Sequence, residues 1–317
     1  PLDSLYLFAF IAFLVAFSGS IQDIAIDAFR IELAGLTHQG NLAASYQFGY
    51  RMAILVSSSF ALIFAADYGW SLTYQLMSFL MLVGMAGALM CPEEVNTSLE
   101  KLTLQNSILE PLKDFISRFG LYFASFLLMI IATYRLTDIV MGPMASPFYL
   151  EKGYSLKEIG YIVKVVAVCA SIFGFFLGGF LVKKAGVKVT LVIGACLVLI
   201  TNLSFSVIAL FEKDLSLLGL VVGADSLAAG VVGTANITFL TSLVSKKYTA
   251  VQYALLTSFM MLPGKIFSGF SGLIASYFKS LYGIEYGWMT FFIFTSLLTI
   301  PSLILLFYYS KKKNAYD

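Results

Sequence analysis

The feature that most constrains this chain is a series of nine apolar stretches, each long enough to cross a lipid bilayer as a helix. One crossing takes about 20 mostly apolar residues. The stretches are 5–29, 44–66, 69–90, 119–141, 157–182, 188–211, 215–243, 250–277 and 286–309. Only 12% of the residues are charged, too few to cover the surface of a water-soluble domain of this length. We therefore expect an all-α membrane protein.

A polar segment, 91–118, separates the first three stretches from the last six. Apolar side chains recur in it at three- and four-residue spacing, namely Leu109, Leu112, Phe115 and Ile116. This spacing is typical of an amphipathic helix lying on the membrane. We expect 1–90 to supply the last three helices of an N-terminal half-bundle and 91–118 to be a cytoplasmic interdomain linker. Residues 119–317 would then form a C-terminal six-helix half-bundle.

Lysine and arginine are shared unequally between the two sides of the expected membrane. The connections after odd-numbered stretches, with the C-terminal tail, carry thirteen of them, and the opposite side carries four. Positive charge is retained on the cytoplasmic side, so the C-terminus is expected inside and Pro1 outside. We see no signal peptide. That orientation then predicts an odd number of upstream helices, and three would balance the six after the linker, so that about nine of twelve are present.

Several classes of function are not indicated. The three cysteines are far apart and His38 is the only histidine, so we expect neither a disulfide framework nor a metal site. No basic face points to nucleic acid, and no cofactor is expected. The loops are short and carry no G-x-S-x-G motif, which disfavours a membrane-embedded enzyme.

Charged residues inside the stretches follow a period of three helices. The first, second, fourth, fifth, seventh and eighth stretches contain or adjoin them, whereas the third and ninth have none and the sixth has none once Lys188 is counted with the preceding loop. They are Asp23, Asp27, Arg30, Arg51, Arg135, Asp138, Lys164, Asp225 and Lys265. A charge at the membrane centre costs about 2.5–3.5 kcal/mol and usually marks function. We interpret two helices of every three as lining an aqueous interior, with the third facing lipid, as in inverted three-helix repeats.

Short motifs spread along nearly the whole chain resemble one family. They are Gln22 to Arg30 (QDIAIDAFR), Gly49-Tyr50-Arg51, Tyr68-Gly69-Trp70, Thr73-Tyr74, Tyr134-Arg135-Leu136-Thr137-Asp138, Gly153 to Gly160, and the basic loop Gly179 to Lys188. In the basic loop, Lys183 stands where an aspartate is usual. Together the motifs resemble the AmpG-type muropeptide permeases of the major facilitator superfamily, from the fourth helix of that family onward.

The resemblance implies a major facilitator helix bundle and a proton symporter in the bacterial inner membrane. Its cargo would be anhydro-muropeptides (GlcNAc-anhydroMurNAc peptides), imported from periplasm to cytoplasm for peptidoglycan recycling. We expect a monomer whose partners are lipid, this sugar-peptide and protons. The same family resembles acetyl-CoA transporters, so transport of acetyl-CoA or another organic anion stays open. An inactive carrier lacking its first three helices is a further alternative.

Asp23, Asp27 and Arg30 share one helical face because they are spaced by four and then three residues. One interpretation is an acid pair that takes and releases a proton against a cation. The other is a structural clamp to Arg51 near the cytoplasmic end. Tyr50 precedes Arg51, and its aromatic face suits stacking on a sugar ring, although aromatic residues in membranes are often interfacial.

Arg135 and Asp138 also share a face, and Tyr134 is spaced so that it could hydrogen-bond Asp138. They form either an intrahelical ion pair or a site in which Arg135 holds a substrate carboxylate in bidentate fashion while Asp138 titrates.

Asp225 falls near mid-membrane in the seventh stretch, and Lys265 follows Pro263-Gly264, an expected helix break. We predict an Asp225–Lys265 pair that a substrate anion or a proton can open, with a permanently closed structural pair as the alternative. Lys164 is expected about 12 Å into the fifth helix, at 1.5 Å per residue.

Overall fold

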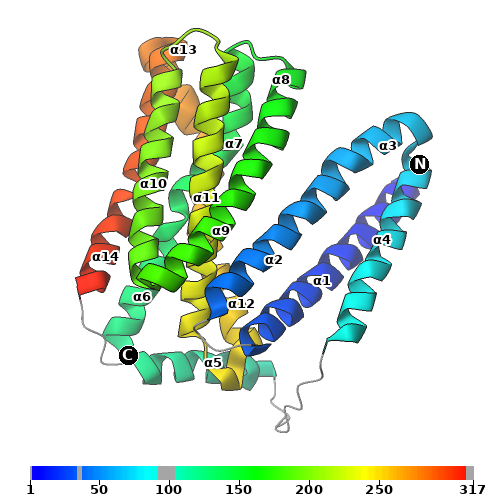
Figure 1. Cartoon of the computed structure of the whole chain (residues 1–317), viewed down its shortest axis with the longest axis vertical. Coiled ribbons are helices and arrows are strands. Elements are labelled where there is room, and N and C mark those ends of the chain that lie inside the picture. Colours follow the sequence, from blue (N-terminus) through cyan, green and yellow to red (C-terminus); the bar gives the residue numbers. More distant parts are fainter. Residues whose placement is uncertain (1, 34–37, 92–103, 312–317) are drawn as a thin grey trace.

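The structure is a computed structural model that describes residues 2–33, 38–91 and 104–311. All regular secondary structure in these ranges is helical (Figure 1). The N-terminal region comprises α1 (Leu2–Leu33), α2 (Gln39–Ile54), a π-helical segment (Leu55–Phe60), α3 (Ala61–Tyr68) and α4 (Trp70–Met90). The π-helical segment joins α2 and α3 into one long rod, so this region crosses three times.

The remaining helices form the C-terminal bundle, preceded by α5 (Leu104–Phe119). Its elements are α6 (Leu121–Tyr134), α7 (Leu136–Glu151), α8 (Leu156–Tyr161), a π-helical segment (Ile162–Val166), α9 (Ala167–Ala185), α10 (Val187–Ile208), α11 (Leu215–Leu243), α12 (Thr249–Ser268), α13 (Ser271–Leu297) and α14 (Ile300–Lys311). Several of these follow one another within a single crossing, as α6 and α7 do on either side of Arg135.

Seven segments of the described chain are long and apolar enough to cross a membrane. The last, Lys246–Lys311, holds two crossings, because the chain reverses inside α13 at Gly283, where φ is +79°. A positive φ of this kind is accessible to glycine and strained for other residues. The α2–α3 rod adds the ninth expected crossing. The sequence-based end of the fourth stretch at 141 was too early, since α7 continues to Glu151.

The C-terminal bundle is closely packed around α11 because glycines let backbones approach. A Cβ added to Gly174 would collide with the Leu227 carbonyl, and one on Gly230 would lie 2.5 Å from the Ser171 carbonyl oxygen. Close approach through small residues is the usual basis of helix association in membranes. At the end of the bundle away from α5, a cluster of aromatic side chains is buried. It consists of Phe148, Phe205, Trp288, Phe291 and Phe292.

The N-terminal region is splayed (Figure 1). The principal neighbours of α2 are α9 and α11, that of α1 is α12, and that of α4 is α3 across the turn at Gly69. Apolar side chains on α1 and α4 are accordingly exposed, among them Phe8 and Val83. Among the described residues, the main contacts between this region and the bundle are those of α1 and α2.

Helix α5 lies across one end of the bundle, as the amphipathic pattern predicts (Figure 1). Phe115 is buried in the bundle core, while Leu109 and Leu112 remain exposed. Gln252 of α12 ties α5 down by donating to the Pro111 carbonyl at 2.8 Å and to Asp114 Oδ2 at 2.8 Å. Residues 92–103 of the expected linker lie outside the described residues, so its boundaries stay a prediction.

Candidate functional site

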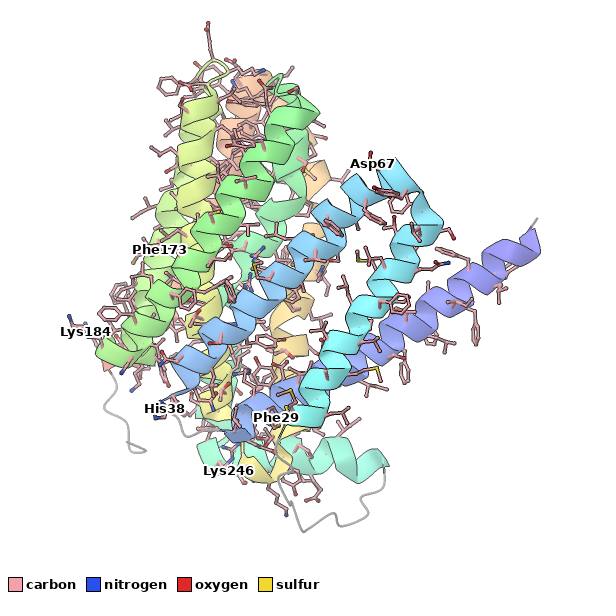
Figure 2. The ribbon with its side chains drawn as sticks, turned by 45° about the vertical axis from the view of Figure 1, so that its right-hand side comes forward. Phe29, His38, Asp67, Phe173, Lys184 and Lys246 are labelled. Atoms are coloured by element: carbon pink, nitrogen blue, oxygen red, sulfur yellow. The ribbon has the colours of Figure 1, made fainter. Side chains whose placement is uncertain are left out.

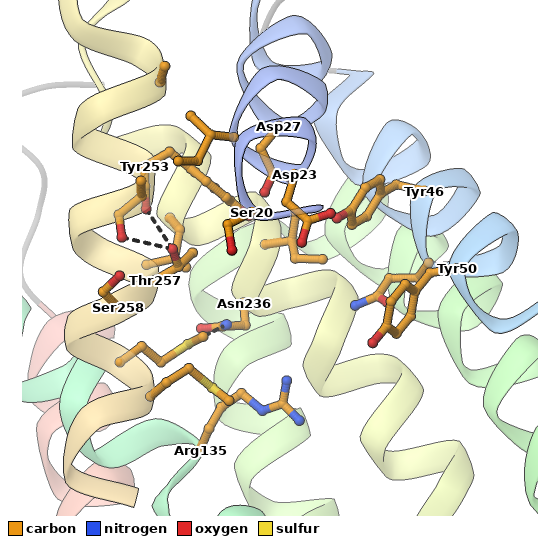
Figure 3. A pocket seen from close by; sticks show the side chains of 18 residues that line it. Ser20, Asp23, Asp27, Tyr46, Tyr50, Arg135, Asn236, Tyr253, Thr257 and Ser258 are labelled. Carbon is orange, nitrogen blue, oxygen red and sulfur yellow. Dashed lines mark hydrogen bonds between the residues drawn. The ribbon is translucent and has the colours of Figure 1, made fainter. Parts of the chain in front are cut away.

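A cavity of about 510 Å³ lies between the N-terminal region and the C-terminal bundle (Figure 3). Its polar lining comes from α1, α2, α11, α12 and the α6–α7 junction. The polar residues are Ser20, Asp23, Asp27, Tyr46, Gln47, Tyr50, Arg135, Asn236, Tyr253, Thr257 and Ser258. Four of the predicted site residues, Asp23, Asp27, Tyr50 and Arg135, therefore meet at one space. They come from both parts of the molecule.

Arg30 lies beside this space, in contact with three residues of its lining, Asp27, Tyr46 and Tyr253. Its guanidinium is only 5% exposed and donates to Thr241 Oγ1 at 3.2 Å and Gln39 Oε1 at 3.4 Å. It also approaches Asp27 Oδ1 at 3.5 Å and lies over the rings of Tyr46 and Tyr253. Because Thr241 and Tyr253 belong to the bundle, Arg30 bridges the two parts. It is placed as a clamp whose partners are these residues, not Arg51.

Arg51 faces the bundle instead of the first helix. Its guanidinium lies 5.8 Å from the centre of the Phe175 ring, and its Nε has no hydrogen-bond partner among the described residues. The positive charge of Arg135 is close enough to act on it. Arg51 thus adds positive potential beside the cavity without lining it.

Arg135 lies at the break between α6 and α7, where its φ of −106° and ψ of 5° depart from helical values. Nη2 is 4.0 Å from Asp138 Oδ2, too far for a hydrogen bond. Arg135 Nε and Asp138 Oδ2 are both buried without partners among the described residues. The pair is therefore loose, and the Arg135 head group is directed into the cavity (Figure 3).

Tyr134 does not bond Asp138. Its hydroxyl donates to the Leu191 carbonyl at 3.2 Å, beside Gly194, where a Cβ would lie 2.8 Å from the hydroxyl oxygen. The glycine makes room for the ring, so Tyr134 holds α6 against α10.

Asp138 of α7 and Asp225 of α11 both belong to the bundle. Thr201 of α10 donates to Asp225 Oδ1 at 3.0 Å. The predicted Asp225–Lys265 pair is wrong, since Lys265 is exposed and contacts no carboxylate among the described residues.

The turn of α12 that carries Lys265 explains this error. The helix is not broken at Pro263 and continues to Ser268, so the prediction of a break is also wrong. Gly264 faces α7, where an added Cβ would lie 2.7 Å from Ile139 Cδ1. Successive helical residues are about 100° apart, so Lys265 points away from that interface. The side chain of Lys164 lies outside the described residues.

Asn236 is the most informative residue that the sequence reasoning missed. It follows Asp225 by eleven residues, or three helical turns, and so shares its face of α11. Its Nδ2 lies 2.9 Å from Met260 Sδ, and its Oδ1 is buried without a partner among the described residues. A search for uncharged polar residues at helical spacing from Asp225 would have found it. Tyr253 and Thr257 could have been found in the same way, because they are polar residues four positions apart on one face of α12.

The charge period is only partly reflected in the geometry. The uncharged crossings α4, α10 and α13–α14 contribute no residue to the lining of the cavity as described, which agrees with the prediction. The fifth crossing, α8–α9, contributes none either, although it carries Lys164. Moreover, α10 is not simply a lipid-facing helix, because Thr201 and Asn202 are buried inside the bundle. Within the described ranges, no three His, Cys, Asp or Glu side chains are grouped to hold a metal.

The sequence is similar to known transporters. The model of the Major Facilitator Superfamily matches residues 2–268. "Putative transporter AmpG 1" of Rickettsia bellii is 30% identical over 96% of this chain and 74% of its own length. The anhydromuropeptide permease of Escherichia coli K12 is 30% identical over 94% of this chain, which spans 59% of that permease. With its helical crossings and a cavity between its N-terminal region and its C-terminal bundle, the chain belongs to the Major Facilitator Superfamily, among its AmpG-type transporters.

Proposed function

We propose that this protein imports anhydro-muropeptides across the bacterial inner membrane in symport with protons. The observation that carries the proposal is the cavity shared by the two parts of the molecule, with Arg135 at a helix break in its wall. Broken helices in the membrane typically surround the substrate sites of secondary transporters. The name of the E. coli relative supplies the cargo.

The lining suits a sugar joined to a short peptide. The rings of Tyr46, Tyr50 and Tyr253 offer flat faces for sugar rings, and Asn236 offers an amide for the peptide. Arg135 matches a lactyl or peptide carboxylate, because a guanidinium binds a carboxylate in bidentate fashion. A volume of about 510 Å³ lies within the usual range for small-molecule sites.

Acetyl-CoA fits this lining less well. Its diphosphate and ribose phosphate carry several negative charges, whereas the cavity presents Asp23 and Asp27 and one lining cation, Arg135. Carboxylates facing a polyanion repel it, and desolvating such charges is costly. A neutral sugar with one or two carboxylates meets a smaller penalty.

The distribution of lysine supports the orientation. Lys184 and Lys246 lie at the same end of the molecule as His38, opposite Asp67 (Figure 2). Positive residues are retained in the cytoplasm, so this basic end and the C-terminus are inside. Arg30 lies beside the cavity and joins the two parts near this basic end, and the α2–α3 rod diverges from α9 toward the other end (Figure 1). We infer that the cavity opens toward the periplasm, ready to receive substrate.

Asp138 and Asp225 are our candidates for proton coupling. Both are carboxylates within the bundle, and a proton on either one removes its negative charge. The loose Arg135–Asp138 pair connects this carboxylate pair to the cavity, because a substrate carboxylate that engages Arg135 competes with Asp138. Substrate binding and proton binding would thereby influence each other.

Uptake of radiolabelled anhydro-muropeptide into cells without their own permease tests the proposal, using the complete gene. Arg135→Gln should reduce uptake about tenfold, the loss expected for one charge-assisted contact. Lys265→Gln is the matched control, since it removes an exposed cation from the same bundle. Absence of uptake at every pH from about 5 to 8 would overturn the cargo and the coupling. Competition by acetyl-CoA at equal concentration would favour the organic-anion alternative.

A further inference from the structure

A second cavity, of about 440 Å³, lies within the C-terminal bundle at its basic end. It is bounded by the start of α6, the α9–α10 turn and the ends of α11 and α14. Its α11 residues include Phe239 and Leu243, whereas the transport cavity uses Asn236, Ile237 and Leu240. The two cavities share no lining residue, so the function proposed above leaves this one unexplained.

The lining is amphiphilic. Phe119 at the end of α5, with Phe123 and Leu127 of α6, forms an apolar wall. Lys188, Ser242 and Ser310 supply a cation and two hydroxyl groups, and none of the lining residues is acidic. Lys188 is half-buried, and its Nζ lies 5.0 Å from the centre of the Tyr309 ring. One cation above an apolar wall matches a molecule with an anionic head and a hydrocarbon tail.

The lysines at the two ends of the bundle have different partners. At the end opposite α5, Lys152, Lys213 and Lys279 each pair with a glutamate, at 3.3, 2.8 and 2.7 Å respectively. At the basic end Lys183, Lys184 and Lys188 contact no carboxylate among the described residues. Lys184 lies over the Phe180 ring, as Lys188 lies over Tyr309. The positive charge around this cavity is therefore not neutralised by described acidic residues.

We propose that this cavity binds the phosphate head group of an anionic phospholipid from the membrane leaflet at the basic end. The phosphate accepts hydrogen bonds from Lys188 and from the Ser242 and Ser310 hydroxyls, which now donate to carbonyls of their own helices. The upper part of one acyl chain lies against Phe119 and Phe123. Basic pockets between helices at the cytoplasmic side are the sites at which such head groups are recognised.

A lipid bound here holds together elements that are distant in sequence. The α9–α10 turn carries Lys188, α14 carries Tyr309 and Ser310, and α6 follows α5 directly through Gly120. Occupancy should thus stabilise the basic end of the bundle, and a soluble anion without an acyl chain would lack the apolar contacts.

Native mass spectrometry of the full purified chain tests the site, with dioleoyl phosphatidylglycerol as the probe and dioleoyl phosphatidylethanolamine as the zwitterionic comparison. We expect tighter binding of phosphatidylglycerol, and Lys188→Gln should weaken it about fivefold, as expected for one lysine near an anionic head group. Lys188→Arg should retain it. Lys246→Gln, the matched control, removes an exposed lysine at the same end that does not line the cavity.

Ser242→Phe gives a second test, because it fills the cavity while leaving every lysine in place. It should abolish the preference for phosphatidylglycerol while the melting temperature without lipid stays near that of the parent. Equal binding of the two lipids, or equal losses in Lys188→Gln and Lys246→Gln, would overturn the proposal in favour of diffuse surface charge. Displacement of the lipid by excess inorganic phosphate would show instead a site for a soluble anion.

Discussion

The C-terminal bundle and the N-terminal region both contain long apolar helices, yet they are packed very differently. In the bundle Leu127, Ile130 and Phe291 are completely buried, whereas Phe8 and Val83 of the N-terminal region are about 70% exposed. The bundle is closed by glycine contacts between α9 and α11, while α1, α2–α3 and α4 form no comparable core in the described residues. Hydrophobicity places a helix in the membrane, but only shape complementarity packs it against another helix, because lipid is as apolar as a leucine side chain.

Two arginine–aspartate pairs show the same contrast at the level of single residues. Asp27 with Arg30 and Arg135 with Asp138 are each spaced by three residues. Arg30 donates to Gln39 within the N-terminal region and to Thr241 across the interface, and it lies over the rings of Tyr46 and Tyr253. Each arginine has a buried Nε without a hydrogen-bond partner among the described residues, but Arg135 stands at a helix break and faces a cavity. The first pair holds the two parts together, and the second is available to a ligand.

The strongest test of the packing difference compares two glycines. Gly174→Val should destabilise the protein by about 3 kcal/mol, because the new side chain meets the Leu227 carbonyl in a tightly packed interface. Gly84→Val in α4 should change stability by less than about 0.5 kcal/mol, since nothing lies within 4 Å of its added Cβ. Thermal unfolding in detergent measures both. Equal shifts would show that α4 is as tightly packed as α9.

Removing the clamp should have the next largest effect. Arg30→Gln loses charge-assisted contacts across the interface and should cost about 2 kcal/mol. The ring centres of Phe48 in α2 and Phe176 in α9 are 6.0 Å apart. Spin labels at these two positions should report a broader distribution of distances in the variant than in the parent protein. Arg118→Gln is the control, because it removes an arginine that bonds Asp114 of α5 and, in the bundle, the Leu243 carbonyl and Gln252. If both variants broaden the distances alike, Arg30 is not a specific clamp.

Neutralising Asp225 tests whether this carboxylate of the bundle takes part in proton coupling. Asp225→Asn should lower uptake about tenfold, because losing the coupled proton removes a driving force equivalent to about one pH unit. The dependence of uptake on pH should also become flatter. Its Thr201 hydrogen bond can be retained by the amide oxygen, so the fold should persist. Asp67→Asn, which changes an exposed carboxylate in the last turn of α3, should leave both properties unchanged. Unaltered uptake by Asp225→Asn would remove that residue from the mechanism.

The smallest effect is expected at the end of the bundle opposite α5. Lys213 Nζ and the Ser155 backbone N–H donate to Glu158 and lower its pKa from 4.5 to about 2. The stability from this depressed pKa is complete above pH 4.5 and is lost as the pH falls toward about 2. Glu158→Gln should therefore reduce the acid sensitivity of unfolding slightly. Glu212→Gln, an exposed carboxylate, should not, and an identical acid profile for both variants would contradict this assignment.

The sequence by itself determined the crossings, the amphipathic α5 and the superfamily. Each depends on local patterns, since about 20 apolar residues suffice to place a helix in lipid. It also identified Asp23, Asp27, Tyr50 and Arg135, because isolated polar groups in apolar helices are costly enough to signal a site.

Only the tertiary structure decided what each charge contacts. Arg30 and Arg135 each stand three residues from an aspartate, but Arg30 is held by Thr241 and Tyr253, more than 200 residues later in the chain. The pairing of Asp225 with Lys265 failed because Gly264, one residue away, is the position that faces α7. Side chains of successive residues in a helix point about 100° apart. Which of them meets a neighbouring helix depends on the packing of the whole bundle.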